Sequence, residues 1–490
     1  MYGLLFLVGS NFGIIDDYVI AQTLLIGKDL PYFIMEDIGR YFPLNGQDIA
    51  IISKVSIAPS AFYFYNLLQF LFIIYLIVKL LTYLFGKNYK NLFYILILIL
   101  ILSPGFSTSW FRLLVPERGA ILFLSVFIYC YIYFQDKQSN SMLIIGVVAA
   151  AISLFYKETM FILVGGLSLY HFIFGYRILT IKQKIFDILL ILTSISWLLI
   201  YYSLVYINKG EAMYGEGVSG QFSSFLKQVL SFSLSDPFAL FLLPTLFVVR
   251  LYAIIKNNER INPLYDGLVF ASILYILTYL KLGIYNYYYL LPIYIYGIIA
   301  IVFFLLKKRY FSNIYIKIAL ILSIILFTFG SFPLGLHSIS HYKNTPYNYQ
   351  KSLSFLTDYI NNSDNKLVIH IDGIKGSNNE PVVSVDKYLS YYGVDNDKYT
   401  LTYGEDYNNK DLIFITSSTM ININDEYFSN LLINYKIIFM KKATFEVPDF
   451  SFRALIKSAL IKYKPVYVNN HNITHKSDFY ILKKIDDKND

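Results

Sequence analysis

Two adjacent acidic residues, Asp16 and Asp17, directly follow the first apolar run of the chain, Met1–Ile15. Two carboxylates side by side can accept a proton from a sugar hydroxyl, or hold a divalent cation beside a phosphate. Aspartate is also a favoured N-cap residue, and Tyr18–Ile26 could be a helix that this pair caps. The pair is therefore a candidate acid–base site, with helix capping as the alternative.

A lysine and a glutamate, Lys157 and Glu158, stand between two apolar runs with almost no connecting loop. Polar groups at the rim of a membrane are costly and often mark functional sites. A lysine in this place could meet a lipid phosphate, with the glutamate orienting it or a second cation. The alternative is a lysine that reaches water at a tight turn and pairs with its neighbour. A turn that needed neither charge would favour Gly, Asn or Ser.

Arginines supply a third group of candidates, Arg112 and Arg118, which flank Glu117. The planar guanidinium fork suits a phosphate or a pyrophosphate. The alternative is that these residues anchor helix ends at the membrane surface. Arg40 and Asp48, earlier in the chain, could line the same site or could simply support the structure of a loop.

Tyrosines crowd the start of a later apolar run, with Tyr287 and Tyr288 among them. Tyrosine rings can pack against sugar rings while their hydroxyls form hydrogen bonds, but such residues also form the aromatic belt of membrane proteins. The segment Asn208–Leu230 carries four glycines. It could be a lid over a substrate or a flexible connector.

These candidates are set in a very apolar chain of 490 residues, of which 56% are hydrophobic and only 15% are charged. The mean hydropathy is +0.51. Soluble globular chains average about 25% charged residues, so the composition argues against a cytosolic enzyme. The single cysteine, Cys130, excludes an intrachain disulfide, and the six histidines leave little material for a zinc or iron site.

Eleven apolar runs approach the length that a membrane helix needs, about 20 residues. They are Met1–Ile15, Phe62–Phe85, Asn91–Ser103, Glu117–Phe134, Ser141–Tyr156, Thr159–Tyr176, Phe186–Ile207, Pro237–Ile255, Leu264–Leu280, Asn286–Leu306 and Asn313–Gly330. The first is short and lacks the basic flank of a signal peptide, so we interpret it as an uncleaved helix or a clipped start.

Basic residues mark one alternate set of the connections between these runs. They are Lys87, Lys90, Lys137, Arg177, Lys182, Lys184, Lys256, Arg260, Lys307, Lys308 and Arg309. This density is typical of cytoplasmic loops and predicts a cytoplasmic N-terminus, an acidic outer loop over residues 16–61 and an extracytoplasmic C-terminal region. The net charge of +8 is then largely topological, and we expect no nucleic-acid partner.

The region 331–490 has a different composition, with short apolar segments between Asn, Asp, Lys and Gly clusters. The predicted strands are Lys366–Asp372, Tyr399–Tyr403, Asp411–Thr416, Tyr435–Met440 and Phe479–Lys483, and the predicted helices are Gln350–Asn361, Asp425–Asn434 and Phe452–Lys462. Gly373–Gly376 is interpreted as a surface turn. The sequence thus predicts an α-helical polytopic membrane protein with about 11 transmembrane helices in residues 1–330, followed by an extracytoplasmic α/β domain in residues 331–490.

This layout resembles the GT-C superfamily of polytopic membrane glycosyltransferases, which take a sugar from a polyprenyl-phosphate carrier on the non-cytoplasmic face. The resemblance rests on Asp16-Asp17 at the start of the first outer loop, on Lys157-Glu158 at an outer helix end, and on an outward domain after the last helix. The tyrosine-rich entry before Pro292 is also similar to these families. The WWDYG-type motif of oligosaccharyltransferases is missing, so transfer of a whole glycan to asparagine is not expected.

The resemblance implies inverting transfer of a hexosyl or pentosyl group from a polyprenyl-phosphate donor to a surface glycan, lipid or protein. One of Asp16 and Asp17 would deprotonate the acceptor hydroxyl, and the other would orient the acceptor or help bind a cation. Mg²⁺ or Mn²⁺ would be that cation if a metal is used. Lys157, with Arg112 or Arg118, would neutralise the leaving lipid phosphate, whose charge grows in the transition state.

Three other classes of protein stay open as alternatives. A polysaccharide polymerase or ligase would usually carry a large loop with arginines between late helices, whereas here the long outer loop is early and acidic. A lipid-linked glycan transporter or flippase would show charges or paired broken helices near mid-membrane. A non-catalytic scaffold would tolerate alanine at all the motif residues. The abundance of Ile, Lys, Asn, Tyr and Phe indicates an AT-rich, bacterial genome, and hence the cytoplasmic (inner) membrane and its lipids.

Overall fold

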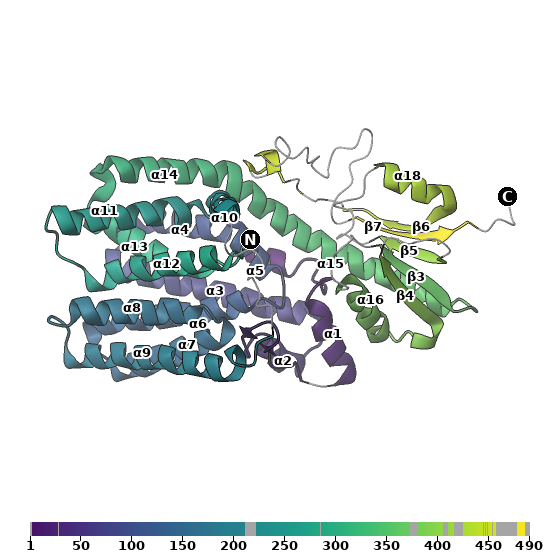
Figure 1. Cartoon of the computed structure of the whole chain (residues 1–490), viewed down its shortest axis with the longest axis horizontal. Coiled ribbons are helices and arrows are strands. Elements are labelled where there is room, and N and C mark those ends of the chain that lie inside the picture. The colour runs from purple at the N-terminus through teal and green to yellow at the C-terminus, as the bar shows by residue number, and fades with distance from the viewer. Residues whose placement is uncertain are drawn as a thin grey trace.

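The computed structural model describes residues 2–27, 29–210, 222–284, 286–372, 380–404, 410–415, 425–443, 445, 447, 449–452, 454–456 and 478–485. A bundle of long apolar helices forms one part, and a sheet with its helices forms a second part beyond one end of the bundle (Figure 1). The predicted architecture, membrane-type helices followed by an α/β domain, is confirmed.

The bundle contains helices whose lengths follow the apolar runs. They are α3 (Pro59–Phe85), α4 (Lys90–Ile101), α5 (Pro104–Trp110), α6 (Pro116–Lys137), α7 (Asn140–Tyr156), α8 (Met160–Gly175), α9 (Ile181–Tyr201), α10 (Phe222–Ser235), α11 (Leu243–Lys256), α12 (Pro263–Leu282), α13 (Leu291–Val302) and α14 (Ile314–Leu326). Short π-helical segments extend α9, α13 and α14 at their ends and precede α11.

Six of the described helices are long and apolar enough to cross a membrane. A bent pair, Lys87–Ile101 with Pro104–Trp110, makes a seventh if it counts as one span, and three further apolar helices are shorter. Each predicted run from Phe62 onward coincides with a described helix.

The predicted first membrane helix, Met1–Ile15, is wrong. Tyr2–Phe6 is a short 3-10 helix, and the chain then runs irregularly to α1, Asp17–Ile26. Glycine favours such a break because it adopts positive φ at little cost, as Gly9 does here with φ 60°. The side chain of Lys343, which lies far along the chain, donates hydrogen bonds to the carbonyl of Phe6.

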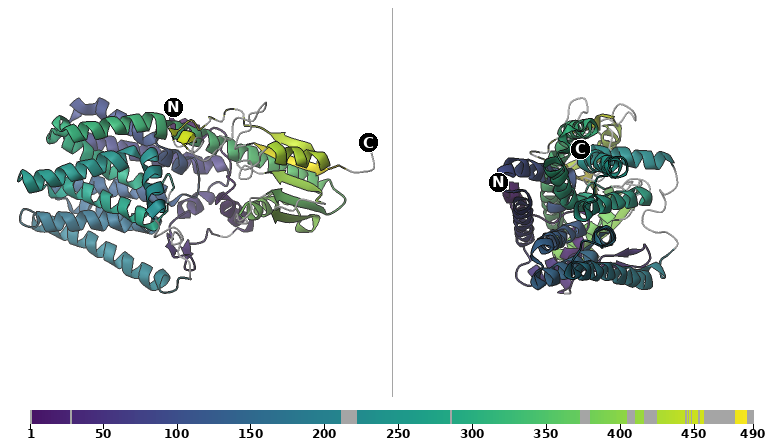
Figure 2. Two further views of the ribbon diagram at one scale, coloured as in Figure 1. Left: turned by 45° about the horizontal axis from the view of Figure 1, so that its top comes forward. Right: turned by 90° about the vertical axis from the view of Figure 1, so that its left-hand side faces the viewer.

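The early segment therefore lies beside the part of the chain that carries the sheet. For the described residues this corrects the predicted placement of the N-terminus on the side opposite to the C-terminal domain. The basic connections α6–α7, α8–α9, α11–α12 and α13–α14 lie together at the other end of the bundle (Figures 1 and 2).

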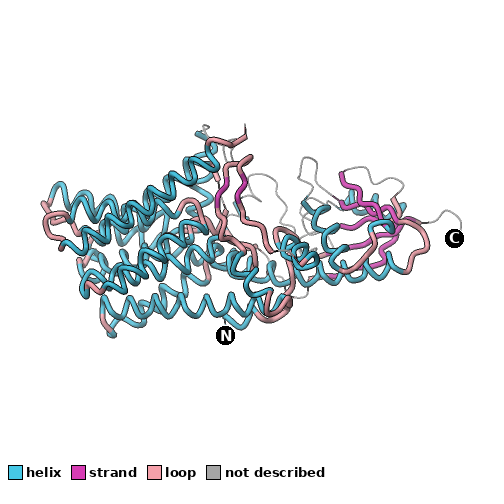
Figure 3. Tube along the Cα trace, turned by 90° about the horizontal axis from the view of Figure 1, so that it is seen from below, coloured by secondary structure: helices cyan, strands magenta, loops and turns pink. Residues whose placement is uncertain are grey.

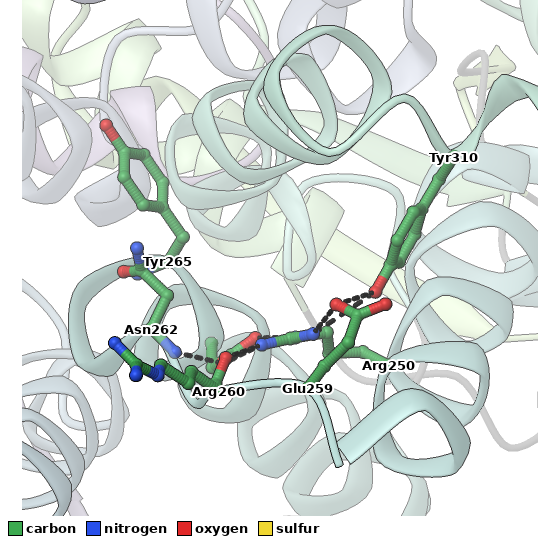
Figure 4. A network of polar contacts seen from close by, with 7 residues as sticks. Arg250, Glu259, Arg260, Asn262, Tyr265 and Tyr310 are labelled. Carbon is green, nitrogen blue, oxygen red and sulfur yellow. Dashed lines mark hydrogen bonds and ion pairs between the residues drawn. The ribbon is translucent and has the colours of Figure 1, made fainter. Parts of the chain in front are cut away.

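A network centred on the buried Arg250 of α11 holds this basic end together (Figure 4). Its Nε lies 2.8 Å from Oδ1 of Asp266, and its Nη1 lies 2.6 Å from Oε2 of Glu259. The hydroxyl of Tyr310 donates to the same glutamate oxygen at 3.1 Å. One arginine thereby links α11, the α11–α12 turn, α12 and the connection that precedes α14.

Residues 16–58 fold between the bundle and the sheet domain (Figure 3). They contain α1, a two-stranded antiparallel hairpin of β1 (Ile34–Met35) and β2 (Arg40–Tyr41), and α2 (Gln47–Ser53). This region is the predicted acidic loop, and its folded elements place charged side chains against the end of the bundle.

The long helix α15 (Phe332–Asn361) continues directly from α14 through a π-helical segment. Helical residues are continuous over Ile314–Asn361, so the predicted domain boundary at residue 330 falls inside a helix. In Figure 1 this helix leads from the bundle to the sheet domain.

The C-terminal sheet has five described strands in the order β4-β3-β5-β7-β6. They are β3 (Leu367–Asp372), β4 (Tyr399–Gly404), β5 (Leu412–Ile415), β6 (Tyr435–Lys441) and β7 (Phe479–Lys484), and all five were predicted. β3 pairs in parallel with β4 and β5, while β7 is antiparallel to β5 and β6.

Among the described residues, three helices pack against this sheet. The last part of α15, where the helix Gln350–Asn361 was predicted, and α18 (Asp425–Asn434) confirm predictions, whereas α16 (Glu380–Tyr391) was not predicted. The predicted turn at residues 373–376 lies outside the described residues, and so do residues 211–221 of the predicted loop Asn208–Leu230. So does the second half of the helix predicted over residues 452–462. The last part of the loop prediction is wrong, because α10 begins at Phe222.

Candidate functional site

Asp16 and Asp17 lie where the chain enters α1, but neither side chain caps that helix. Asp16 has a φ of 66°, an uncommon conformation for a residue other than glycine, and its Oδ2 lies 2.5 Å from Nη2 of Arg112. Asp17 is buried, and its Oδ2 accepts a hydrogen bond of 2.8 Å from the N–H of Gly13. The geometry therefore gives no support to the capping alternative.

Asp17 faces a cavity of about 190 Å³. Side chains from separate parts of the chain meet there: Tyr63 from α3, Arg112 from the turn after α5, and His341 and Tyr342 from α15. Burial raises the pKa of Asp17 to about 6, while the N–H of Gly13 and the charge of Arg112 act in the opposite direction. Such a carboxylate is ionised at neutral pH and is a stronger base than an ordinary aspartate.

Arg112 lies beside the two carboxylates and between two aromatic rings. Its guanidinium carbon is 6.0 Å from the ring centre of Tyr288 and 5.8 Å from that of Tyr342. Among the described residues, Asp16 is the side-chain acceptor that pairs with it, and Arg112 lines the cavity. A guanidinium carries five N–H donors, so one carboxylate does not use them all. The arrangement suits a second anion, such as a phosphate.

Lys157 and Glu158 belong to a cluster of four charges that alternate in sign, in which Lys157 and Glu117 are buried and Arg40 and Glu158 are partly buried. Nζ of Lys157 lies 2.8 Å from Oε1 of Glu117 and 3.9 Å from Oε2 of Glu158. Arg40 of β2 forms an ion pair with Glu158. Burial alone would raise the pKa of Glu158, but the charges of Arg40 and Lys157 hold it below its usual value. Three members of the cluster, Arg40, Lys157 and Glu158, line a second cavity of about 80 Å³.

A pair of tyrosines joins the two cavities. Tyr288 lies against Arg112, and its ring meets that of Tyr289 edge to face at 4.9 Å. Nζ of Lys157 lies 4.6 Å from the ring centre of Tyr289. The carbonyl oxygen of Tyr287 faces Gly105, where an added Cβ would lie only 2.4 Å from it. The close approach of α5 thus positions this tyrosine segment.

Two other predicted residues lie outside both cavities. Arg118 donates through Nη1 and Nη2 to the carbonyls of Arg112 and Leu113, each at 2.7 Å, and so stabilises the turn between α5 and α6. Asp48 accepts a hydrogen bond of 3.4 Å from Gln69. Burial raises the pKa of Asp48, with the charge of Arg118 acting against this effect. Their contacts are those of residues that support the site.

Sequence reasoning missed several residues that the fold brings into the site. Glu117 was considered only beside its arginine neighbours, although an acidic residue at the start of an apolar helix is a usable signal. His341 and Tyr342 reach the Asp17 cavity from α15, more than 300 residues along the chain. No local pattern indicates that contact, because it depends on how α15 crosses the end of the bundle.

The donor set around the aspartate pair does not fit a metal ion. The described residues hold no group of three or more His, Cys, Asp or Glu side chains that could ligate one. The two carboxylates are directed at different partners, Arg112 and the N–H of Gly13. The positive charge beside the pair is that of Arg112.

No protein-family model matches the chain, and no curated protein matches its sequence. Among solved structures, the chain is similar to the crystal structure of ArnT from Cupriavidus metallidurans bound to undecaprenyl phosphate. The identity is 11%, 90% of this chain and 94% of that chain are covered, and the TM-score is 0.46. At this identity and TM-score, the similarity concerns the course of the backbone and not the side chains.

Proposed function

We propose that the chain is an inverting glycosyltransferase of the GT-C type, which moves a sugar from a polyprenyl-phosphate donor to a hydroxyl acceptor. One observation carries this proposal: the buried carboxylate of Asp17 and the guanidinium of Arg112 face the same cavity at one end of a membrane-type helix bundle. A base and an anion-binding cation are the two groups that such a transfer needs from the protein.

Asp17 is the proposed general base. The acceptor hydroxyl gives its proton to the Asp17 carboxylate while its oxygen attacks the anomeric carbon from the face opposite to the phosphate. The bond from the anomeric carbon to the phosphate oxygen breaks, and its electron pair leaves with the polyprenyl phosphate. The raised pKa of Asp17, about 6, strengthens it as a base while keeping it ionised at neutral pH.

Arg112 is the proposed phosphate ligand. Its charge would stabilise the lipid phosphate, which becomes more negative as the sugar leaves. Asp16 holds the guanidinium in place, and the rings of Tyr288 and Tyr342 flank it. Asp16 is thus assigned to orienting Arg112, and the two adjacent carboxylates have different roles.

The four-charge cluster around Lys157 has a supporting role in this proposal. Two acidic and two basic side chains already neutralise each other there, so an incoming phosphate would have to displace a buried ion pair. Lys157 instead holds the ring of Tyr289, which in turn packs against Tyr288 beside Arg112. The cluster therefore fixes one wall of the donor site.

The proposed location is the outer face of a bacterial cytoplasmic membrane. The basic connections gather at the end of the bundle opposite to the site, as expected of cytoplasmic loops. The proposed site then opens on the extracytoplasmic side, beside the C-terminal sheet domain. The acceptor can be a glycan, a lipid or a protein that presents a hydroxyl group.

The buried His171–Asp187 network does not favour transport as a second function. His171 and Asp187 lie 2.8 Å apart, and Tyr131 donates to the same carboxylate at 2.6 Å. Because α8 ends at Gly175 and α9 begins at Ile181, this network lies near the basic end of the bundle and not at its middle.

The test compares wild type, Asp17→Asn and a control, Asp29→Asn, in a deletion strain. Asp29 lies in the same acidic region but is 82% exposed and lines neither cavity. Mass spectrometry of surface glycans and lipid-linked sugars should show one missing sugar and an accumulated donor with Asp17→Asn alone. Identical glycans in all three strains would contradict the proposal and would favour a transporter or a non-catalytic scaffold.

A further inference from the structure

The backbone before the aspartate pair is held by side chains from the C-terminal third of the chain. Residues 6–15, here called the N-terminal strap, have little regular structure. Five of their carbonyls accept hydrogen bonds from α15 and α16: Lys343 donates to Phe6 and Val8, Gln350 to Phe12, Tyr388 to Gly13, and Ser384 to Ile14. Buried carbonyls need such partners wherever no helix or sheet supplies them.

One of these contacts leads directly to the proposed base. The carbonyl of Phe12 accepts a hydrogen bond of 3.0 Å from Nε2 of Gln350. The N–H of the same peptide group, which belongs to Gly13, donates to Oδ2 of Asp17 at 2.8 Å. The other end of the Gln350 amide accepts a hydrogen bond from the hydroxyl of Tyr392. A single line of hydrogen bonds therefore runs from Tyr392 to Asp17.

We infer that Gln350, oriented by Tyr392, is a positioning residue for the Asp17 carboxylate and acts through the Phe12–Gly13 peptide. The inference rests on the proposed function, because it matters for catalysis only if Asp17 is the base. It gives the C-terminal part of the chain a defined task in the reaction, separate from any contact with the acceptor.

Physical chemistry explains why an amide suits this place. A donor on a peptide carbonyl polarises that peptide and strengthens the hydrogen bond made by its N–H. A neutral amide does so without adding a charge next to a carboxylate that must stay available for a proton. The ionisable groups already near Asp17 are its chain neighbour Asp16 and, from other elements, Tyr63, Arg112, His341 and Tyr388.

The local backbone also needs this support. Asp16 has a positive φ, a strained conformation for a residue other than glycine that persists only where surrounding contacts impose it. The ion pair with Arg112 holds the side chain of Asp16, but it does not orient Asp17. The Gly13 N–H donates to the Asp17 carboxylate at 2.8 Å, and it acts on that group more strongly than the backbone of Leu114 does. Gln350 fixes the peptide that carries this N–H.

The first test is a kinetic comparison of Gln350→Met, Tyr392→Phe and a control, Tyr391→Phe. Methionine fills the space of glutamine without a strong donor. We expect Gln350→Met to lower kcat by roughly ten- to hundredfold, the range for a slightly misplaced catalytic group, with the KM for the lipid donor unchanged. Tyr392→Phe should also lower kcat, but by a smaller factor. Tyr391→Phe keeps the ring that packs on Phe12 and should match wild type.

The second test does not depend on activity. Hydrogen–deuterium exchange of peptides covering residues 10–18, measured in nanodiscs, should be faster in Gln350→Met and in Tyr392→Phe than in Tyr391→Phe. If wild type transfers no sugar, the proposed function fails, while the exchange result still decides the positioning role. An unchanged kcat with unchanged exchange in Gln350→Met would overturn the inference, and so would a change in the donor KM alone. If Gln350→Met does not fold, Tyr392→Phe gives the same two readouts.

Discussion

Nζ of Lys157 and Oε1 of Glu117 lie 2.8 Å apart, and both side chains are almost completely withdrawn from solvent. This ion pair joins the α7–α8 turn to the first turn of α6, where the helix dipole also favours a negative charge. The lysine that sequence reasoning assigned to a lipid phosphate is therefore already matched by a carboxylate of the protein.

Glu117→Gln should destabilise the protein by about 3–5 kcal/mol, because it leaves the Lys157 charge buried beside a neutral amide. The double variant Glu117→Gln/Lys157→Met should recover much of that loss, since it removes both charges. Thermal unfolding in detergent or nanodiscs measures both effects. A Lys157→Met variant of normal stability with a tenfold higher KM for the lipid donor would instead make Lys157 the phosphate ligand.

Asp17→Asn should abolish transfer and yet increase stability at pH 7.5. The pKa of Asp17 in the fold, about 6, is above its ordinary value, so folding disfavours the ionised carboxylate. The stability that the protonated form contributes is present below about pH 4 and is lost as pH rises through 6. The cost at pH 7.5 is about 3 kcal/mol at most, and asparagine removes it while still accepting the Gly13 N–H.

Measuring the free energy of unfolding at pH 4 and pH 7.5 tests whether the ionised Asp17 carboxylate destabilises the fold. The difference in stability between Asp17→Asn and wild type should be large at pH 7.5 and close to zero at pH 4. An equal difference at both values would show that the asparagine acts through packing and not through the ionisation of Asp17.

Activity should depend on pH through the same group. A general base must be deprotonated, so kcat/KM should fall tenfold for each pH unit below about 6 and level off above it. Measuring kcat/KM of the purified enzyme as a function of pH, with a saturating acceptor, tests this dependence. If kcat/KM fell only below about pH 4, the base would be a fully solvated carboxylate, which would exclude the buried Asp17.

Arg112→Lys should raise the KM for the polyprenyl-phosphate donor and lower kcat, because lysine lacks the planar fork that contacts Asp16 and a phosphate together. We expect kcat/KM to fall by roughly a hundredfold, the effect of losing one preorganised charged donor. Lys54→Ala, at an exposed residue of the same region, is the matched control. Equal losses in both variants would point to a general effect of charge on donor binding.

Much of the fold could be predicted because its signals are local. Hydropathy located the helices from Phe62 onward, and alternating short apolar segments located the five strands of the C-terminal sheet. The prediction of a first membrane helix was wrong because glycines interrupt that apolar run and because its residues pack along α3 without forming a spanning helix. Helix α16 was missed, since Pro381 and two valines near its start do not resemble a helical pattern.

The candidate site could be predicted only as a set of residues. The sequence alone identified Asp16, Asp17, Arg112 and Lys157, because charges next to long apolar runs are costly and visible without any structure. Their pairing depended on tertiary structure. Arg112 meets Asp16 across 96 positions of sequence, and Gln350 reaches the Phe12 carbonyl across 338. Contacts over such separations depend on how the helices pack at the end of the bundle. The local sequence around each residue carries no information about that packing.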